Sequence, residues 1–138
     1  MSYVRNISLL LFIILIIAGS NIQSQNKPVL YFCETYGAEG EVGISDRFTV
    51  GKITLMVKSY YPIGEEHIVI QFDRYNPALN IFEFYKTFSY TIEPTSKYVF
   101  FSTNEESDLS FDDPGFYRVF LLNTNNEVIT SSLVEIVY

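Results

Sequence analysis

Few residues in this chain could carry out catalysis, and they form no familiar catalytic set. His67 is the only histidine among the 138 residues, and it follows Glu65 and Glu66 at the start of an apolar run. A nucleophile–histidine–acid triad would need a serine beside this histidine, and no nucleophile-elbow sequence accompanies it. We therefore expect His67 to be a solvated turn residue. We predict no enzyme activity, no catalytic residue and no cofactor.

A second candidate site is an acidic segment that contains Glu105, Glu106, Asp108, Asp112 and Asp113 within nine positions. Calcium takes six to eight oxygen ligands from carboxylates and carbonyls, so this segment is a candidate calcium loop. Its spacing does not match an EF-hand. The alternative is an acidic surface loop that keeps the protein soluble. The single histidine and single cysteine exclude two-histidine and multi-cysteine metal motifs.

Aromatic residues are the third candidate, because 11 Tyr and 12 Phe exceed what one core of this size can hide. Tyrosine suits protein interfaces and sugar stacking, since its ring is apolar and its tip is polar. Tyr60, Tyr61 and Tyr75 are the predicted contact residues. The alternative is that these rings form cross-strand aromatic pairs that stabilise a sheet.

The charge of the chain limits its partners. It has 9 Lys and Arg against 16 Asp and Glu, a net charge of −7. Nucleic acids and anionic membrane surfaces are bound by clustered basic residues, so neither is an expected partner.

Residues 1–24 are predicted to be a secretory signal peptide. Arg5 precedes an apolar run over residues 9–18, which is followed by small and polar residues. A membrane-spanning helix needs about 20 apolar residues, so this run favours a cleaved signal over an uncleaved anchor. Cleavage could follow Ser20 or Ser24, and Ser24 is the preferred position. The protein would then be exported, to the periplasm, the outer surface or the medium, with residues 25–138 as one domain and no membrane span. Cys33 lies too far from the run for a lipid-acceptor cysteine, and we expect it to be a small buried hydrophobe.

The rest of the chain is typical of an all-β protein. Seven runs of β-branched and aromatic residues alternate with Gly, Pro, Asn and Asp clusters. The predicted strands are Val29–Thr35, Phe48–Lys58, His67–Arg74, Ile81–Ile92, Lys97–Thr103, Gly115–Asn123 and Glu127–Val137. Residues 37–45 are predicted to be a surface loop, and residues 123–126 a hairpin turn.

Period-two alternation assigns the faces of these strands. Ile68, Ile70 and Phe72 are expected to share the core face of the third strand. In the fourth strand the expected core face is the set Phe82, Phe84, Phe88, Tyr90 and Ile92. The second strand changes phase at Gly51, which predicts a β-bulge there.

The segment Asp113-Pro114-Gly115-Phe116-Tyr117-Arg118-Val119 resembles the start of strand F in immunoglobulin-like domains. The resemblance implies an antiparallel β-sandwich of about seven strands, in which the Tyr117 hydroxyl bonds the backbone just upstream. The disulfide and the strand-C tryptophan of antibody domains are absent, and Phe72 is the residue that could fill the tryptophan's place. The pattern is similar instead to bacterial immunoglobulin-like and fibronectin-III-like sandwiches.

A weaker similarity links Pro114–Val137 to the C-terminal sorting domains of type IX secretion cargo, although no passenger domain precedes it here. The fold alone names no function. The predicted function is a non-enzymatic binding or structural module of the cell envelope that contacts a protein or a glycan through loops or an edge strand. The alternative is a small carbohydrate-binding or calcium-dependent module.

Overall fold

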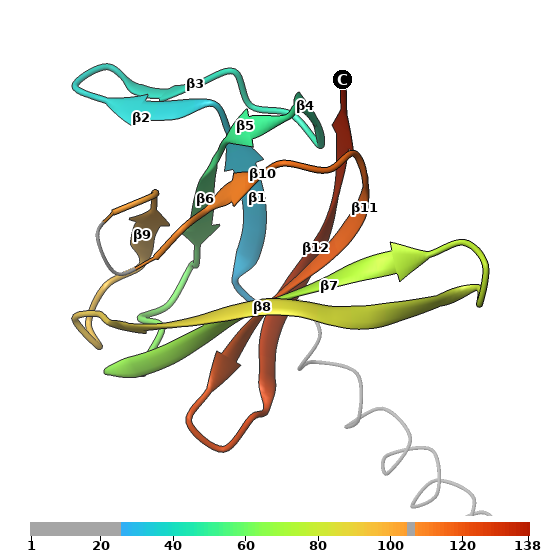
Figure 1. Ribbon diagram of the computed structural model, residues 1–138. Helices are drawn as coiled ribbons and strands as arrows, with labels where there is room; N and C mark the ends of the chain where they lie inside the picture. The colour runs from blue at the N-terminus through green and yellow to red at the C-terminus, as the bar shows by residue number, and fades with distance from the viewer. Residues whose placement is uncertain (1–25, 105–106) are drawn as a thin grey trace, which may run out of the picture.

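The computed structural model describes residues 26–104 and 107–138, and all of its regular secondary structure is β-strand (Figure 1). The predicted signal peptide lies outside the described residues, as do Glu105 and Glu106. Within the described part of the chain, no helix is long and apolar enough to cross a membrane.

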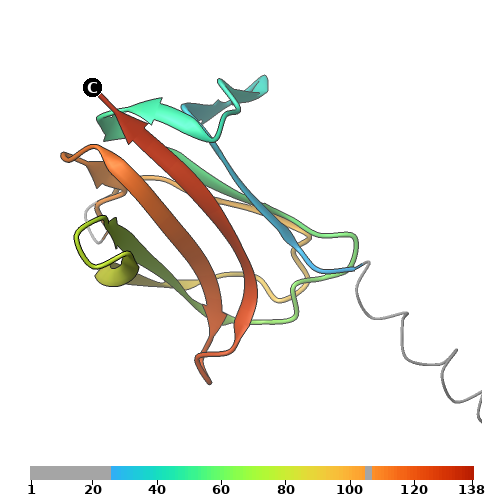
Figure 2. The ribbon, with the colours of Figure 1, turned by 90° about the vertical axis from the view of Figure 1, so that its right-hand side faces the viewer.

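Two sheets pack face to face, as the turned view shows (Figure 2). The first has the order β1-β6-β9 and consists of β1 (Val29–Cys33), β6 (Thr54–Lys58) and β9 (Tyr98–Phe101). The second has the order β4-β12-β11-β7-β8 and consists of β4 (Arg47–Thr49), β12 (Val128–Val137), β11 (Gly115–Asn123), β7 (His67–Asn76) and β8 (Ile81–Thr91). Neighbouring strands are antiparallel, except that β4 runs parallel to β12.

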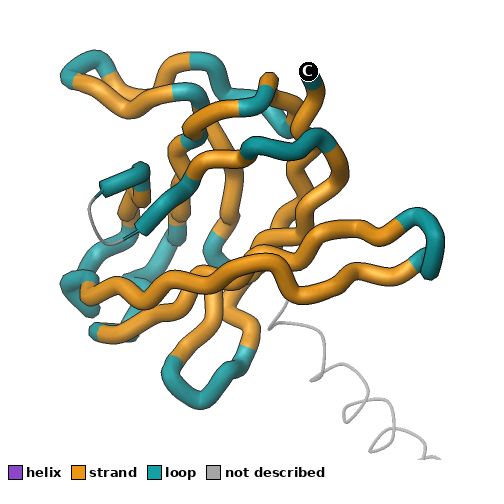
Figure 3. The backbone as a smooth tube through the Cα atoms, in the orientation of Figure 1, coloured by secondary structure: helices purple, strands orange, loops and turns teal. Residues whose placement is uncertain are grey.

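Two short strand pairs complete the fold. The hairpin of β2 (Thr35–Gly37) and β3 (Gly40–Val42) begins before the segment predicted as a loop, residues 37–45, and extends into it, and β5 (Gly51–Lys52) pairs with β10 (Ser110–Phe111). The tube in Figure 3 shows how short the connections between strands are.

The core lies between the two sheets and follows the predicted alternation in most strands. Ile68, Ile70 and Phe72 of β7 are at most 1% exposed, which confirms their predicted face. Phe72 packs against Phe88 and Phe111, with ring centroids 6.3 and 5.6 Å away, so it fills part of the aromatic centre. Cys33 is also fully buried, as predicted.

The single second strand predicted over Phe48–Lys58 is wrong. The chain forms β4 in the five-stranded sheet, β5 against β10, and β6 in the three-stranded sheet. Gly51 has φ 138°, a value that side chains disfavour, and it lies where the chain leaves the five-stranded sheet. The phase change at Gly51 therefore marks a crossover between sheets rather than a bulge within one strand.

The predicted faces of β8 are also partly wrong. Phe72 pairs with Lys86 and Asp73 pairs with Phe84, so Tyr85 is an extra residue that forms a β-bulge. The bulge changes which alternate residues of β8 face the core on either side of Tyr85. Phe84 is 65% exposed, whereas the Tyr85 ring packs 5.4 Å from the buried Tyr117 ring.

The turn between β11 and β12 is the predicted hairpin. The Asn123 side-chain oxygen accepts hydrogen bonds from the backbone N–H groups of Asn125 and Glu127, at 3.0 and 2.9 Å. Asn126 adopts φ 62°, a left-handed conformation that asparagine tolerates.

Tyr117 forms the tyrosine corner that the motif implied. The side chain is fully buried, and its hydroxyl donates a 2.9 Å hydrogen bond to the backbone carbonyl of Asp113. Burial raises the pKa of Tyr117 to about 12. Gly115 lies between Asp113 and Tyr117 in the sequence and has φ 149°. The bend into β11 therefore favours a residue without a Cβ.

We expect Tyr117→Phe to lower the free energy of unfolding by about 1 kcal/mol, because it removes one buried hydrogen bond and leaves the ring in place. Urea denaturation followed by fluorescence measures this change. Tyr75→Phe is the control, because the Tyr75 hydroxyl bonds the exposed Asn80 side chain. Equal stability of the parent and the Tyr117→Phe chain would contradict the structural role of this hydroxyl.

Candidate functional site

The structure does not bring the three predicted contact tyrosines together. Tyr60 and Tyr61 are 76% and 52% exposed and pack edge-to-face in the connection before β7. Tyr75 is half-buried near the other end of β7, where its ring packs on Phe82 and its hydroxyl bonds Asn80. Since β7 has 10 residues, about 30 Å at about 3.3 Å per residue, these tyrosines cannot form one compact contact surface.

The acidic segment forms no converging cluster among its described members. Asp113 pairs with Arg74 at 3.0 Å, and Asp108 accepts the backbone N–H of Ser110 at 3.0 Å. Hydrogen bonding to the Ser110 side chain, and then to this backbone N–H, lowers the pKa of Asp108. Across residues 26–104 and 107–138, no three His, Cys, Asp or Glu side chains come close enough to hold a metal ion. Glu105 and Glu106 lie outside the described residues.

His67 lies exposed at the start of β7, and its Nδ1 atom is 3.3 Å from the Thr91 hydroxyl. A hollow of about 430 Å³ lies between the end of β8 and β9. Its lining includes aromatic side chains such as Tyr90 and Phe101, and Glu93 is the only carboxylate among the described residues that line it. Among residues 26–104 and 107–138, neither place brings together the pair of carboxyl or imidazole groups that acid–base catalysis commonly uses.

The surface best suited to contact is the outer face of the five-stranded sheet, where large apolar side chains are exposed. Phe84, Phe116 and Leu133 are 65%, 50% and 55% exposed. They come from β8, β11 and β12, three different strands of one sheet. We call these three residues, with their half-buried neighbours, the aromatic face. The neighbours are Tyr75, Phe82, Phe120 and Arg118.

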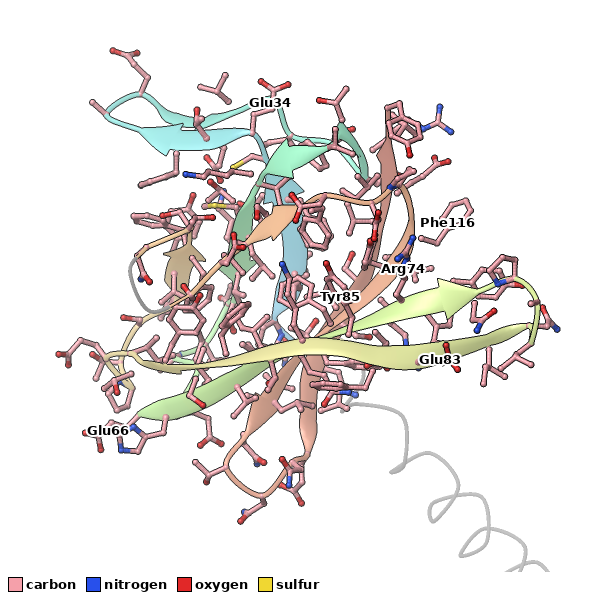
Figure 4. All side chains as sticks on the ribbon, in the orientation of Figure 1. Glu34, Glu66, Arg74, Glu83, Tyr85 and Phe116 are labelled. Atoms are coloured by element: carbon pink, nitrogen blue, oxygen red, sulfur yellow. The ribbon has the colours of Figure 1, made fainter. Side chains whose placement is uncertain are left out.

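Strand register aligns this face across the sheet. Leu133 pairs with Arg118, Arg118 with Asp73, and Asp73 with Phe84. These four residues form one row across β12, β11, β7 and β8, about 14 Å long at about 4.8 Å per strand. Phe116 precedes Tyr117 in β11, and Figure 4 shows its ring projecting away from the sandwich.

An ion pair lies at the centre of the aromatic face. Arg118 contacts Asp73 at 3.1 Å, and the Asp73 side chain is only 9% exposed. Gln71 donates a further hydrogen bond to Asp73 at 2.8 Å. The Arg118 guanidinium lies 4.6 and 4.8 Å from the ring centroids of Phe82 and Phe120. These contacts hold Arg118 flat among apolar side chains, so it adds contact area as well as charge.

Two shallow hollows border this face. One, of about 290 Å³, is lined partly by Phe116 and Leu133. The other, of about 320 Å³, is lined partly by Tyr75 and Phe84. Such hollows beside exposed rings can receive side chains of a partner.

The long edge strand β8 is protected in its middle against pairing with another strand. The bulge at Tyr85 interrupts the edge, and Lys86 points inward and donates hydrogen bonds to the carbonyls of Asp108 and Ser110, at 2.8 and 2.5 Å. The ammonium lies 4.7 Å from the ring centroid of Phe111, and burial lowers the pKa of Lys86. Bulges and inward charges are devices that prevent edge-to-edge association. The face of the sheet is therefore better suited to contact than this edge.

Sequence reasoning selected Tyr75 but missed the three exposed residues of the aromatic face, Phe84, Phe116 and Leu133. The bulge turns Phe84 outward, but the alternation of apolar and polar residues in the sequence does not reveal the bulge. Phe84 was therefore expected in the core. The sequence of β11 did carry a signal for this face. The outward-facing positions include Phe116, Phe120 and Leu122, so they are nearly as apolar as the core-facing positions. A sheet face that met only water would carry mostly polar residues there.

The strand order defines the class of fold. One sheet corresponds to strands A, B and E, and the other to strands G, F, C and C′, of an immunoglobulin-like sandwich. The tyrosine corner at the start of β11, the strand that corresponds to F, agrees with this assignment. The protein is thus an all-β, immunoglobulin-like β-sandwich.

Comparison with solved structures finds chains of similar fold. The crystal structure of an immunoglobulin-like protein from Pseudomonas aeruginosa matches with a TM-score of 0.49 and 8% sequence identity, over 85% of this chain and 100% of that one. No protein-family model matches the sequence, and no curated protein matches it. The fold assignment here rests on the strand order and the tyrosine corner.

We expect Lys86→Met to make the protein associate through β8, because the substitution removes the inward charge that protects this edge. Light scattering coupled to size exclusion measures the mass of the parent and variant chains at equal concentration. Lys97→Met, at an exposed lysine outside the strands, is the control. A Lys86→Met chain with the mass of the parent would show that Lys86 does not protect the edge.

Proposed function

We propose that this protein is an exported, non-enzymatic module of the cell envelope that binds another protein through the aromatic face. The observation that carries the proposal is the exposure of Phe84, Phe116 and Leu133 on one sheet face around the Arg118–Asp73 ion pair. Aromatic residues and arginine are enriched at protein interfaces, and energetically dominant contacts cluster at their centres. The alignment of these residues in neighbouring strands makes the face a single surface.

The partner is a different protein whose contact surface is apolar and bordered by basic residues. Removing residues 1–24 takes away Arg5 and no acid, which leaves 8 basic and 16 acidic residues and a net charge of −8. Two copies of such a chain repel each other, whereas a basic partner is attracted. Within the face, the Arg118 and Asp73 charges neutralise each other, so the apolar contacts dominate its centre.

Cross-linking through a photoreactive residue tests this contact. We expect p-benzoylphenylalanine at position 116 to cross-link one envelope protein, and the same residue at position 60 to give no such product. A triple variant should bind that envelope protein at least tenfold more weakly in a pull-down with the purified chain. Its substitutions are Phe84→Ser, Phe116→Ser and Leu133→Ser, and a melting curve confirms that the variant is folded. The matched control is Tyr60→Ser with Tyr61→Ser.

Three outcomes of that experiment contradict the proposal. A cross-link only from position 60 would move the contact to the Tyr60–Tyr61 loop. A cross-link to a second copy of this chain would replace the heterologous partner with a dimer. Retention of polysaccharide in place of protein would favour the carbohydrate-binding alternative.

Export is tested separately by the N-terminus of the chain recovered from the cell envelope. Mass spectrometry should find Gln25 as the first residue, because the apolar run over residues 9–18 matches a cleaved signal. A recovered chain that retains residues 1–24 would contradict cleavage, and a chain confined to the cytoplasm would contradict export.

A further inference from the structure

The β2–β3 hairpin is attached to the sandwich mainly at its base. Its two strands pair with each other and belong to neither large sheet. At the base, the backbone N–H of Glu34 donates to the Val42 carbonyl at 3.0 Å, and Ser45 donates to the Phe32 carbonyl at 3.2 Å. Figures 1 and 2 show the hairpin reaching away from the end of β1, beyond the body of the sandwich.

Residues of the three-stranded sheet that point away from the core are nevertheless buried. Phe32, Leu55 and Val57 face the core, so alternation directs Cys33 and Met56 to the outer face. Both are 0% exposed. A water-facing sheet surface would leave them accessible, so another part of the chain covers them.

Tyr36 and Glu41 of the hairpin contact this outer face, and the Cys33 thiol donates a 3.3 Å hydrogen bond to the backbone carbonyl of Thr35 in β2. The Tyr36 ring lies 4.4 Å from the Phe100 ring and 5.8 Å from the Tyr98 ring. Strand register places Met56 between Phe100 and Tyr31, which is bonded to Glu41. The hairpin therefore rests on an apolar surface built from β1, β6 and β9.

Glu41 connects the hairpin to this surface through two polar contacts. Its carboxylate accepts the Tyr31 hydroxyl at 2.5 Å and the Lys58 ammonium at 2.7 Å. The Lys58 ammonium also lies 4.7 Å from the ring centroid of Tyr98. The contact with Lys58, and then that with Tyr31, lowers the pKa of Glu41, and burial raises the pKa of Tyr31 to about 12.

We propose that the β2–β3 hairpin is a lid, held shut by Glu41, that opens without unfolding of the sandwich and uncovers a second apolar surface on β1, β6 and β9. Segments held by few backbone hydrogen bonds open at a lower free energy than the core strands. The hairpin has strands of three residues each and shares no ladder with the two large sheets. Opening separates Tyr36 from Phe100 and exposes Met56 and Cys33.

Cys33 reports this opening, because it is the only cysteine of the chain and is fully buried. The rate at which Ellman's reagent modifies it in native buffer measures how often the lid opens. We expect Glu41→Gln to raise this rate at least tenfold, since it removes the charge that holds Lys58 and weakens the bond from Tyr31. Glu39→Gln is the matched control, at an exposed glutamate in the turn of the same hairpin.

Low concentrations of urea separate lid opening from global unfolding. Opening of the short hairpin over residues 35–42 exposes little surface, so the labelling rate should depend weakly on urea, whereas labelling through global unfolding depends on it steeply. A parent rate that follows global unfolding would overturn the proposal, as would a rate unchanged by Glu41→Gln. If Glu41→Gln fails to fold, Tyr31→Phe removes one of the two contacts, and an unchanged rate in that chain overturns the proposal equally.

Discussion

The hydrogen bond from the buried Tyr117 hydroxyl to the Asp113 carbonyl sets the position of the strand on which the rest of the structure depends. β11 is paired on both sides, with β12 and β7, so its orientation determines that of the five-stranded sheet. Because Tyr117 points into the core, alternation directs Phe116 and Arg118 outward. The corner that stabilises the fold thus also determines which residues of β11 lie on the aromatic face.

The sequence predicted those features of the fold that depend on local pattern. The bounds of β11 agree with the predicted strand, because Gly115 and Asn123 mark its ends and apolar residues fill it. Features that depend on tertiary pairing were not predictable in the same way. Alternation does not say which sheet a strand joins, so the crossover at Gly51 was taken for a bulge. The bulge at Tyr85 is set by pairing with β7, and without it Phe84 would point inward.

The candidate site was less predictable than the fold for a related reason. Tyr60 and Tyr61 were selected as residues of a connection, and they are exposed. The exposed residues of the aromatic face instead lie up to 49 positions apart in the chain, from Phe84 to Leu133. Only strand order and register bring them into one row. The contacts of Lys86 and of Glu41 could not be predicted for the same reason. Each contact joins segments of the chain that no local sequence pattern connects.

Among the described residues, these contacts leave the aromatic face as the apolar surface proposed to bind a partner. The inward Lys86 lies in the middle of the β8 edge, and the β2–β3 hairpin contacts the outer face of the three-stranded sheet through Tyr36 and Glu41. Hydroxyl-radical footprinting of side chains, in intact cells and on the purified chain, tests this account most directly. It predicts that Phe84, Phe116 and Leu133 are oxidised several-fold more slowly in cells, with Tyr60 and Tyr61 unchanged. Equal oxidation of the three residues in both samples would contradict it.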